Sequence, residues 1–191
     1  AGVLRFSAAW PDAKLWDTDT PQHRYTATLS LLDKAGAVVE VLTPAHFGFR
    51  EIRIEGRDFL LNGTPIHLRA LHNTTSVSAA DKASHSAAIE MCRRMFEYGF
   101  NAIIAGNYDF MPGSVSYLDG LLDACDETGM LLAFTLPHLK DFGYRLDKPE
   151  TAERYRAQTA WLIRRARNHP SVIFYAMNHN CTGYYGDQNP Q

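Results

Sequence analysis

Polar side chains that could do chemistry follow each of four short apolar runs in the second part of the sequence. Amides, a phenol and imidazoles are among them, and such donors and acceptors could bind the hydroxyl groups of a sugar. The histidines could also act as acid and base or as metal ligands, but no pair has the His-x-x-x-His spacing of a helical zinc site. We therefore predict a polar site without a metal, formed by His72, Asn73, Asn107, Tyr108, His138, Asn178, His179 and Asn180. The alternative is that single histidines only end a strand or line a polar loop.

The fourth run shows how the sequence would position such groups. Asn168-His169-Pro170 interrupts a charged helical segment, because proline cannot continue a helix and biases the residue before it toward extended backbone. The run from Val172 to Tyr175 is apolar, β-branched and aromatic, which is typical of a strand buried in a parallel sheet. Where a strand leaves a parallel barrel, its last polar groups face whatever the barrel binds. Taken alone, the local pattern favours a simpler reading, a buried strand followed by an ordinary polar loop.

Strand and helix patterns alternate from Ile66 onward. Four parallel strands joined by three helices predict either a doubly wound sheet or a (β/α) barrel. No Gly-x-Gly-x-x-Gly or Walker-type loop follows the first strand, so a nucleotide-binding sheet has no support and the barrel is favoured. Strands are expected at about 66–71, 101–105, 130–134 and 171–177. The first helix is expected at 79–98, and the second from about 118 to a cap at Gly129. The third helix is expected to begin at an N-cap at Asp147, with Glu150 completing a capping box.

Several side chains of this alternating region are predicted to be structural. Cys92 and Cys125 fall on apolar helix faces, which indicates two buried thiols. Trp161 on the third helix and Tyr175 in the last strand are expected in the core rather than as platforms for a sugar. The paired carboxylates of Asp126 and Glu127 are expected at a helix end, in a structural role.

The first forty-odd residues have the pattern of β structure. Arg24 to Leu32 alternates apolar and polar residues, which predicts a half-buried strand. Asp33-Lys34-Ala35-Gly36 forms a turn, and Ala37 to Leu42 returns as a second strand. Because isolated hairpins are marginally stable in water, these strands are expected to be the last ones of a sandwich whose earlier strands are missing.

Composition limits the classes of partner. The chain has 191 residues, 21% of them charged, and a net charge of −2, so neither nucleic acid nor an anionic membrane is expected as a partner. No apolar stretch approaches the ~20 residues of a membrane helix, and no signal peptide is visible. Three cysteines cannot all pair within one chain, so they do not fix the compartment. A bacterial secreted, periplasmic or cytoplasmic location agrees equally well with the sequence.

Five segments, in this order and at compatible spacing, carry a resemblance to a known family. They are Phe47-Gly48-Phe49-Arg50, Asn62-Gly63-Thr64-Pro65-Ile66-His67-Leu68-Arg69, Gly99-Phe100-Asn101-Ala102-Ile103, Cys125-Asp126-Glu127-Thr128-Gly129-Met130 and Asn168-His169-Pro170-Ser171-Val172-Ile173. Together they resemble glycoside hydrolase family 2, which holds the β-galactosidases, β-glucuronidases and β-mannosidases. The resemblance implies an α/β fold: residues 1–46 would end an immunoglobulin-like β-sandwich domain, and residues 47–191 would be the N-terminal half of a TIM-barrel glycoside hydrolase domain, with four of its eight βα units.

The departures from the family pattern fall at the strand ends. The family's general acid/base glutamate would fall on Asn180, the asparagine before it on His179 and the preceding glycine on Asn178. A retaining mechanism needs two carboxyl groups, and an amide cannot replace the acid. The family's nucleophile would lie beyond residue 191. The resemblance also implies a substrate-binding role for Arg69, which matches an arginine of the family's first barrel strand, and for Tyr108 after the second strand.

Three functions from different classes follow from these observations. The first is a piece of a protein that hydrolyses β-glycosidic bonds of the β-galactosidase or β-glucuronidase type, with no cofactor and with the rest of the site supplied from outside this sequence. The second is a non-catalytic relative that only binds carbohydrate, and the third is an enzyme on the same scaffold that uses His138 or His179. A half barrel would leave its first and fourth strands without neighbours, so we expect a second copy of the chain or the remainder of the barrel to cover them.

Overall fold

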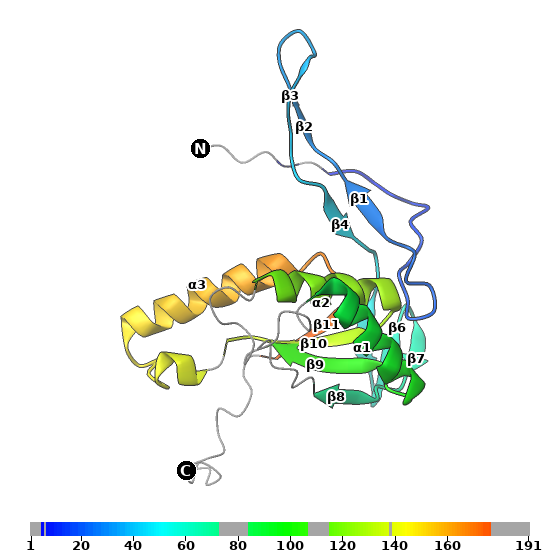
Figure 1. Ribbon diagram of the computed structural model, residues 1–191, viewed down its shortest axis with the longest axis vertical. Helices are drawn as coiled ribbons and strands as arrows, with labels where there is room; N and C mark the ends of the chain where they lie inside the picture. The colour runs from blue at the N-terminus through cyan, green and yellow to red at the C-terminus, as the bar shows by residue number, and fades with distance from the viewer. Residues whose placement is uncertain (1–4, 6, 73–83, 107–114, 138, 177–191) are drawn as a thin grey trace.

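The main body of the molecule is a layer of helices on a parallel sheet (Figure 1). The structure is a computed structural model, and it describes residues 5, 7–72, 84–106, 115–137 and 139–176. The sheet contains β8 (Ala70–His72), β9 (Ala102–Gly106), β10 (Leu131–Thr135) and β11 (Val172–Ala176), and the helices are α1 (His85–Glu97), α2 (Val115–Thr128) and α3 (Pro149–Ala166), with a short 3-10 helix η1 (Leu139–Phe142) after β10. The strand order is β11-β10-β9-β8, and every neighbouring pair is parallel. This confirms the predicted partial (β/α)8 barrel, preceded by β strands.

The largest hydrophobic core lies between this sheet and its helices. Because side chains alternate between the two faces of a strand, Leu132 and Phe134 of β10 enter this core, while Leu131 joins a second cluster on the other face. Burial of each such side chain stabilises the fold by about 1.5–3 kcal/mol. The helices contribute Ala88, Cys92, Leu118, Leu121, Leu122, Ala124, Cys125, Leu162 and Ala166 to the same core.

The two described cysteines lie in this core, on α1 and α2. Cys92 and Cys125 are both fully buried and unbridged, which confirms their prediction as buried thiols. The neighbouring Cys92 thiol, together with burial, raises the pKa of Cys125 well above its usual range. Cys125 is therefore held as a neutral packing group.

A three-stranded antiparallel sheet precedes the barrel strands. It consists of β5 (Ile52–Glu55), β6 (Asp58–Leu61) and β7 (Thr64–Ile66), and a turn at Asn62-Gly63 joins the last two. Both turn residues have positive φ, 51° at Asn62 and 82° at Gly63, as such a tight hairpin requires. The prediction of one strand over 66–71 is therefore wrong: Ile66 pairs back onto β6, and only Ala70–His72 enters the parallel sheet.

Helix α3 begins differently from its prediction. Lys148 is the N-cap, no side chain caps the helix, and Pro149 occupies the first turn, where its missing N–H costs nothing. Asp147 instead forms two hydrogen bonds with Arg145, of 2.7 and 2.6 Å, so the predicted capping box is wrong. Trp161 is 40% exposed and lies against the guanidinium of Arg165. Tyr175 is 38% exposed, so the predictions of both residues in the core are wrong too. None of the described helices combines the length and the apolar composition needed to cross a membrane.

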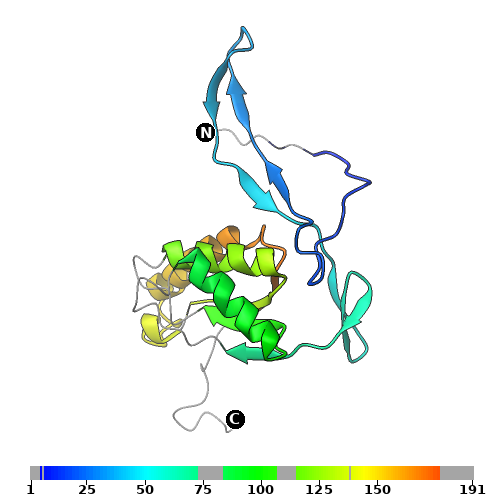
Figure 2. The same cartoon turned by 45° about the vertical axis from the view of Figure 1, so that its right-hand side comes forward.

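The N-terminal strands form a ribbon that projects from the α/β body (Figures 1 and 2). In it, β1 (Tyr25–Ala27) pairs with β4 (Ala45–Phe47) and β2 (Ser30–Leu32) with β3 (Val38–Val41), both antiparallel. The single strand predicted over 24–32 is thus two strands. It is also not half-buried, because Leu29 and Leu31 are 51% and 55% exposed in a ribbon that no second sheet covers among the described residues. The predicted domain boundary after His46 falls inside β4.

Candidate functional site

The carboxyl ends of the four parallel strands lie at one edge of the sheet. Gly106, Thr135 and Ala176 end β9, β10 and β11 in direct register, and His72 ends β8 opposite Ile104. The Thr135 hydroxyl donates a hydrogen bond to the carbonyl oxygen of Ala105 at 3.1 Å, which ties two of these ends together. The last residues of these strands therefore lie side by side, at the edge that carries the binding loops in a parallel barrel.

Most of the predicted site residues come after the strand ends in the sequence. His72 is described: it is the last residue of β8 and is half-buried. Its place at the carboxyl edge agrees with the prediction. The other predicted members of the polar site lie outside the described residues, and their meeting with His72 stays a prediction: Asn73, Asn107, Tyr108, His138, Asn178, His179 and Asn180.

Arg69 makes its contacts at the opposite edge of the sheet. Its Nε donates a hydrogen bond to the carbonyl oxygen of Gly99, and its backbone N–H donates one to Oδ1 of Asn101 at 2.8 Å. Gly99 and Asn101 both precede β9, so these contacts join the amino ends of β8 and β9. The guanidinium is thus engaged away from the edge where substrate is expected, and a substrate-binding role for Arg69 stays a prediction.

A buried polar network lies at this amino edge. The Asp126 carboxylate, at the end of α2, accepts hydrogen bonds from the backbone N–H of Ser171 at 3.0 Å, from its hydroxyl at 2.6 Å and from Nδ1 of His169 at 2.7 Å. Asp126 and Ser171 are 2% and 0% exposed. Although these residue types also form hydrolytic triads, Ser171 donates to the carboxylate and not to the imidazole, so no nucleophile is activated.

The same network explains a group of possible metal ligands. Oδ1 of Asp123 lies 4.0 Å from Nδ1 of His169, and together with Asp126 these residues could surround an ion. Both oxygens of Asp126 are already used by three donors, so the cluster has the features of a structural hydrogen-bond network. Glu127 pairs with Arg24 at 3.6 Å and with His85 at 3.0 Å on the surface. The structural roles predicted for Asp126 and Glu127 agree with these contacts. The binding of Asp126 by His169 and Ser171 had no signal in the sequence.

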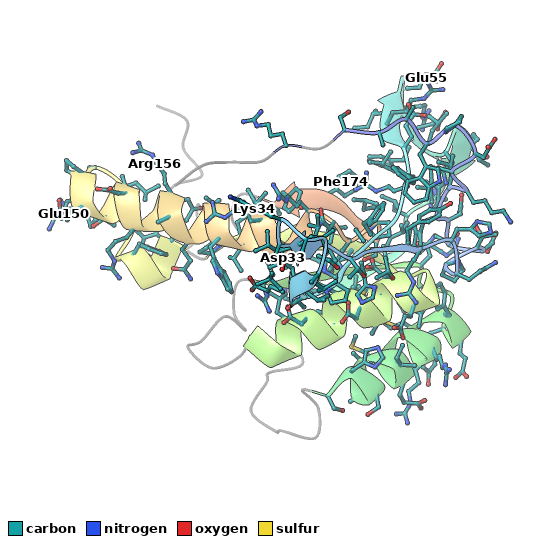
Figure 3. The ribbon with its side chains drawn as sticks, turned by 90° about the horizontal axis from the view of Figure 1, so that it is seen from above. Asp33, Lys34, Glu55, Glu150, Arg156 and Phe174 are labelled. Atoms are coloured by element: carbon teal, nitrogen blue, oxygen red, sulfur yellow. The ribbon has the colours of Figure 1, made fainter. Side chains whose placement is uncertain are left out.

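The antiparallel sheet closes the inner face of the barrel strands at the amino end. Ile52, Leu61 and Ile66 pack with Ala102, Leu131 and Ile173, and the rings of Phe59 and Phe174 lie 5.5 Å apart. Figure 3 shows Phe174 over the middle of the molecule, while Glu55, Glu150 and Arg156 lie at its periphery. Apolar side chains thus fill this end of the barrel strands, while His72 lies at the opposite, carboxyl edge.

Comparison with known proteins agrees with this geometry. No family model matches the chain. The β-galactosidase of Enterobacter cloacae is 27% identical over 168 residues, which cover 85% of this chain and 16% of that protein. The chain thus spans about one sixth of the length of the curated relatives that it matches.

Solved structures share the fold. A β-glucuronidase from Ruminococcus gnavus, in complex with an N1-substituted uronic isofagomine, matches with a TM-score of 0.66 and 23% identity, over 92% of this chain and 29% of that one. A family 2 β-galacturonidase from Eisenbergiella tayi, bound to galacturonate, matches with a TM-score of 0.63 and 23% identity, over 87% and 28%. The sequence relatives and the structural neighbours together confirm the resemblance drawn from the five sequence segments.

Proposed function

We propose that this chain supplies the first half of a site that acts on β-linked galactosides or glucuronides. The proposal follows from its resemblance to glycoside hydrolase family 2 in both sequence and fold. The observation that carries the proposal is the alignment of the four strand ends at one edge, with His72 among them. The other half of such a site, including the nucleophile, would come from later strands of a longer protein.

The chemistry that this half can perform depends on residue 180. Retaining hydrolysis needs one carboxyl group to protonate the leaving oxygen and another to attack the anomeric carbon. With Asn180 in the acid position, the site would donate and accept hydrogen bonds but supply no proton. A protein with this site would cleave only glycosides whose leaving group departs without protonation, while it would still bind the sugar.

A non-catalytic, carbohydrate-binding relative is the second candidate. One observation favours it: the described residues that end the strands are His72, Gly106, Thr135 and Ala176, and none of these carries a carboxylate. The third candidate, an enzyme that uses His138 or His179 as its acid, needs a histidine within reach of the leaving oxygen. All three candidates share the binding of a β-linked sugar.

Sugar binding is therefore the property to test first. Methyl β-galactoside and methyl β-glucuronide would be titrated into the purified chain and followed by calorimetry. His72→Gln should weaken binding roughly three- to tenfold, because one hydrogen bond contributes about 0.5–1.5 kcal/mol. His67→Gln is the matched control, since His67 precedes the same strand and is exposed. A folded chain that binds neither sugar would overturn the proposal.

We also propose that the free edges of the sheet are covered, by a second copy of the chain or by the remaining barrel strands. Among the described residues, β8 and β11 each pair with one neighbour only, and Leu71 of β8 is 44% exposed. Bare strand edges pair readily with other strands. Sedimentation of the purified 191-residue chain should show self-association, and a well-folded monomer at micromolar concentration would contradict coverage by a second copy.

A further inference from the structure

The start of β11 pairs irregularly with β10. Leu132 lies opposite Val172, but the next residue of β10, Ala133, lies opposite Phe174, so Ile173 is skipped. A bulge of this kind places two residues opposite one and bends the strand. In a regular ladder Ala133 would face Ile173 instead, and every later residue of β11 would move by one place. Because side chains alternate between the two faces, such a shift would turn each of them to the other face.

Arg50 binds the chain on both sides of Ser171, at the first residues of this irregular segment. Its Nε donates a hydrogen bond to the carbonyl oxygen of Pro170 at 2.9 Å, and one Nη donates to the carbonyl oxygen of Val172. The planar guanidinium presents its N–H groups in a fixed geometry, so it holds the two carbonyl groups at a defined separation. Burial lowers the pKa of the Arg50 guanidinium, while Tyr175 and Asp126 nearby raise it.

Other contacts hold the same segment at different atoms. Ser171 is bound through its N–H and hydroxyl to Asp126, and its carbonyl oxygen accepts the N–H of Leu132 at 2.8 Å. Successive carbonyl groups of a strand point to opposite sides, so the Val172 carbonyl points away from β10, to the free edge. Arg50 reaches it there from the segment that follows β4.

We propose that Arg50 is a positioning residue that selects the bulged register of β11 and so sets which side chains leave its carboxyl end toward the proposed sugar site. The effect on sugar binding rests on the proposed function, whereas the effect on register does not. Asn178 follows Ala176 by two residues in the sequence, so a one-residue shift of β11 would change the path into the predicted site.

The register can be read by nuclear magnetic resonance. Cross-strand contacts of Ala133 with Phe174 report the bulge, and contacts with Ile173 report the regular ladder. In Arg50→Ala, the Ala133–Phe174 contacts should be replaced by Ala133–Ile173 contacts or by a mixture of both. Arg50→Lys keeps the positive charge and one donor nitrogen, so it should retain part of the bulged form. Arg53→Ala is the control, because Arg53 lies on β5, is half exposed and pairs with Glu55. Unchanged Ala133–Phe174 contacts in a folded Arg50→Ala variant would overturn the inference.

Chemical rescue separates positioning from general stabilisation. A hollow of about 660 Å³ borders Arg50 and is lined also by Gly48, Glu51, Arg167 and Pro170, so a small cation can reach the vacated carbonyl groups. Arg50→Ala should weaken methyl β-galactoside binding about tenfold, and methylguanidinium at millimolar concentration should restore it. A loss of unfolding free energy with unchanged sugar affinity would show a merely structural role. If the unaltered chain binds no sugar, the proposed function fails, and the register experiment still decides on Arg50.

Discussion

The indole Nε1 of Trp16 donates a hydrogen bond to the backbone carbonyl oxygen of Asp126, 2.9 Å away and 110 residues further along the chain. The same aspartate holds Ser171 through its carboxylate. One residue of α2 therefore connects the segment before the ribbon with the start of the last strand. This connection fixes the amino end of the barrel strands, and its parts can be tested separately.

Trp16→Phe should lower the free energy of unfolding by about 1–3 kcal/mol. Phenylalanine keeps most of the apolar contact but leaves the buried Asp126 carbonyl without its donor. Urea unfolding followed by circular dichroism would measure the change. Trp10→Phe serves as the control, because Trp10 is 51% exposed and should change stability by less than about 0.5 kcal/mol. Equal effects of the two substitutions would contradict the role of the hydrogen bond.

Gly129→Ala should be far more damaging than Gly99→Ala. Both glycines have nearly the same positive φ, 80° and 82°, and the left-handed conformation alone costs an alanine about 1–2 kcal/mol. A Cβ at Gly129 would also lie 2.2 Å from the carbonyl oxygen of Thr18, whereas a Cβ at Gly99 meets nothing within 4 Å. The difference between the urea unfolding midpoints of the two variants measures the cost of the contact with Thr18. Equal midpoints would show that Thr18 moves aside without a cost in stability.

Asp126→Asn should destabilise the chain by about 3–5 kcal/mol, because it removes the buried charge and replaces one carboxylate oxygen by an NH2 group, which then faces either the two donors of Ser171 or the ring nitrogen of His169. Asp123→Asn removes a charge one turn away on the same helix, at a side chain that is 47% exposed. It should cost less than about 1 kcal/mol. Thermal unfolding would measure the loss of unfolding free energy in both variants. The prediction requires the loss in Asp126→Asn to be at least twice the loss in Asp123→Asn.

The 191-residue chain should not hydrolyse nitrophenyl β-galactoside. Nitrophenolate leaves without protonation, so the deciding reason is the nucleophile, which the resemblance places outside these residues. Asn180→Glu would add a carboxyl group but no second one, so it should be inactive as well. Release of nitrophenol is the measurement, with Asn180→Ala as the background. Turnover by the unaltered chain above that background would refute the prediction.

Local signals in the sequence predicted the elements well where nothing competed with them. Asn62-Gly63 gave a hairpin because both residues accept positive φ, and the apolar faces of α1 and α2 placed Cys92 and Cys125 in the core. The prediction of Asp147 as an N-cap is wrong because its carboxylate binds Arg145, two residues before it, and not the helix N-terminus. The register of β10 and β11 was not predictable from either strand alone.

The candidate site was predicted only in outline. The alternation of strands and helices implies that their carboxyl ends share an edge, and His72 lies there. The contacts of Arg69 with Gly99 and of Arg50 with Val172 depend on chain segments 30 and 122 residues apart, for which a single sequence carries no pairing signal.

The long separation between Trp16 and Asp126 has a consequence for synthesis. At about 5–20 residues per second, a ribosome would place roughly 5–20 s between the two residues. During that interval the indole has no acceptor at Asp126, although the local hairpins can already form within microseconds. The N-terminal segment would therefore dock onto α2 only after Asp126 has been made, and until then the nascent chain would have to keep the indole of Trp16, which is fully buried in the folded protein, from other partners.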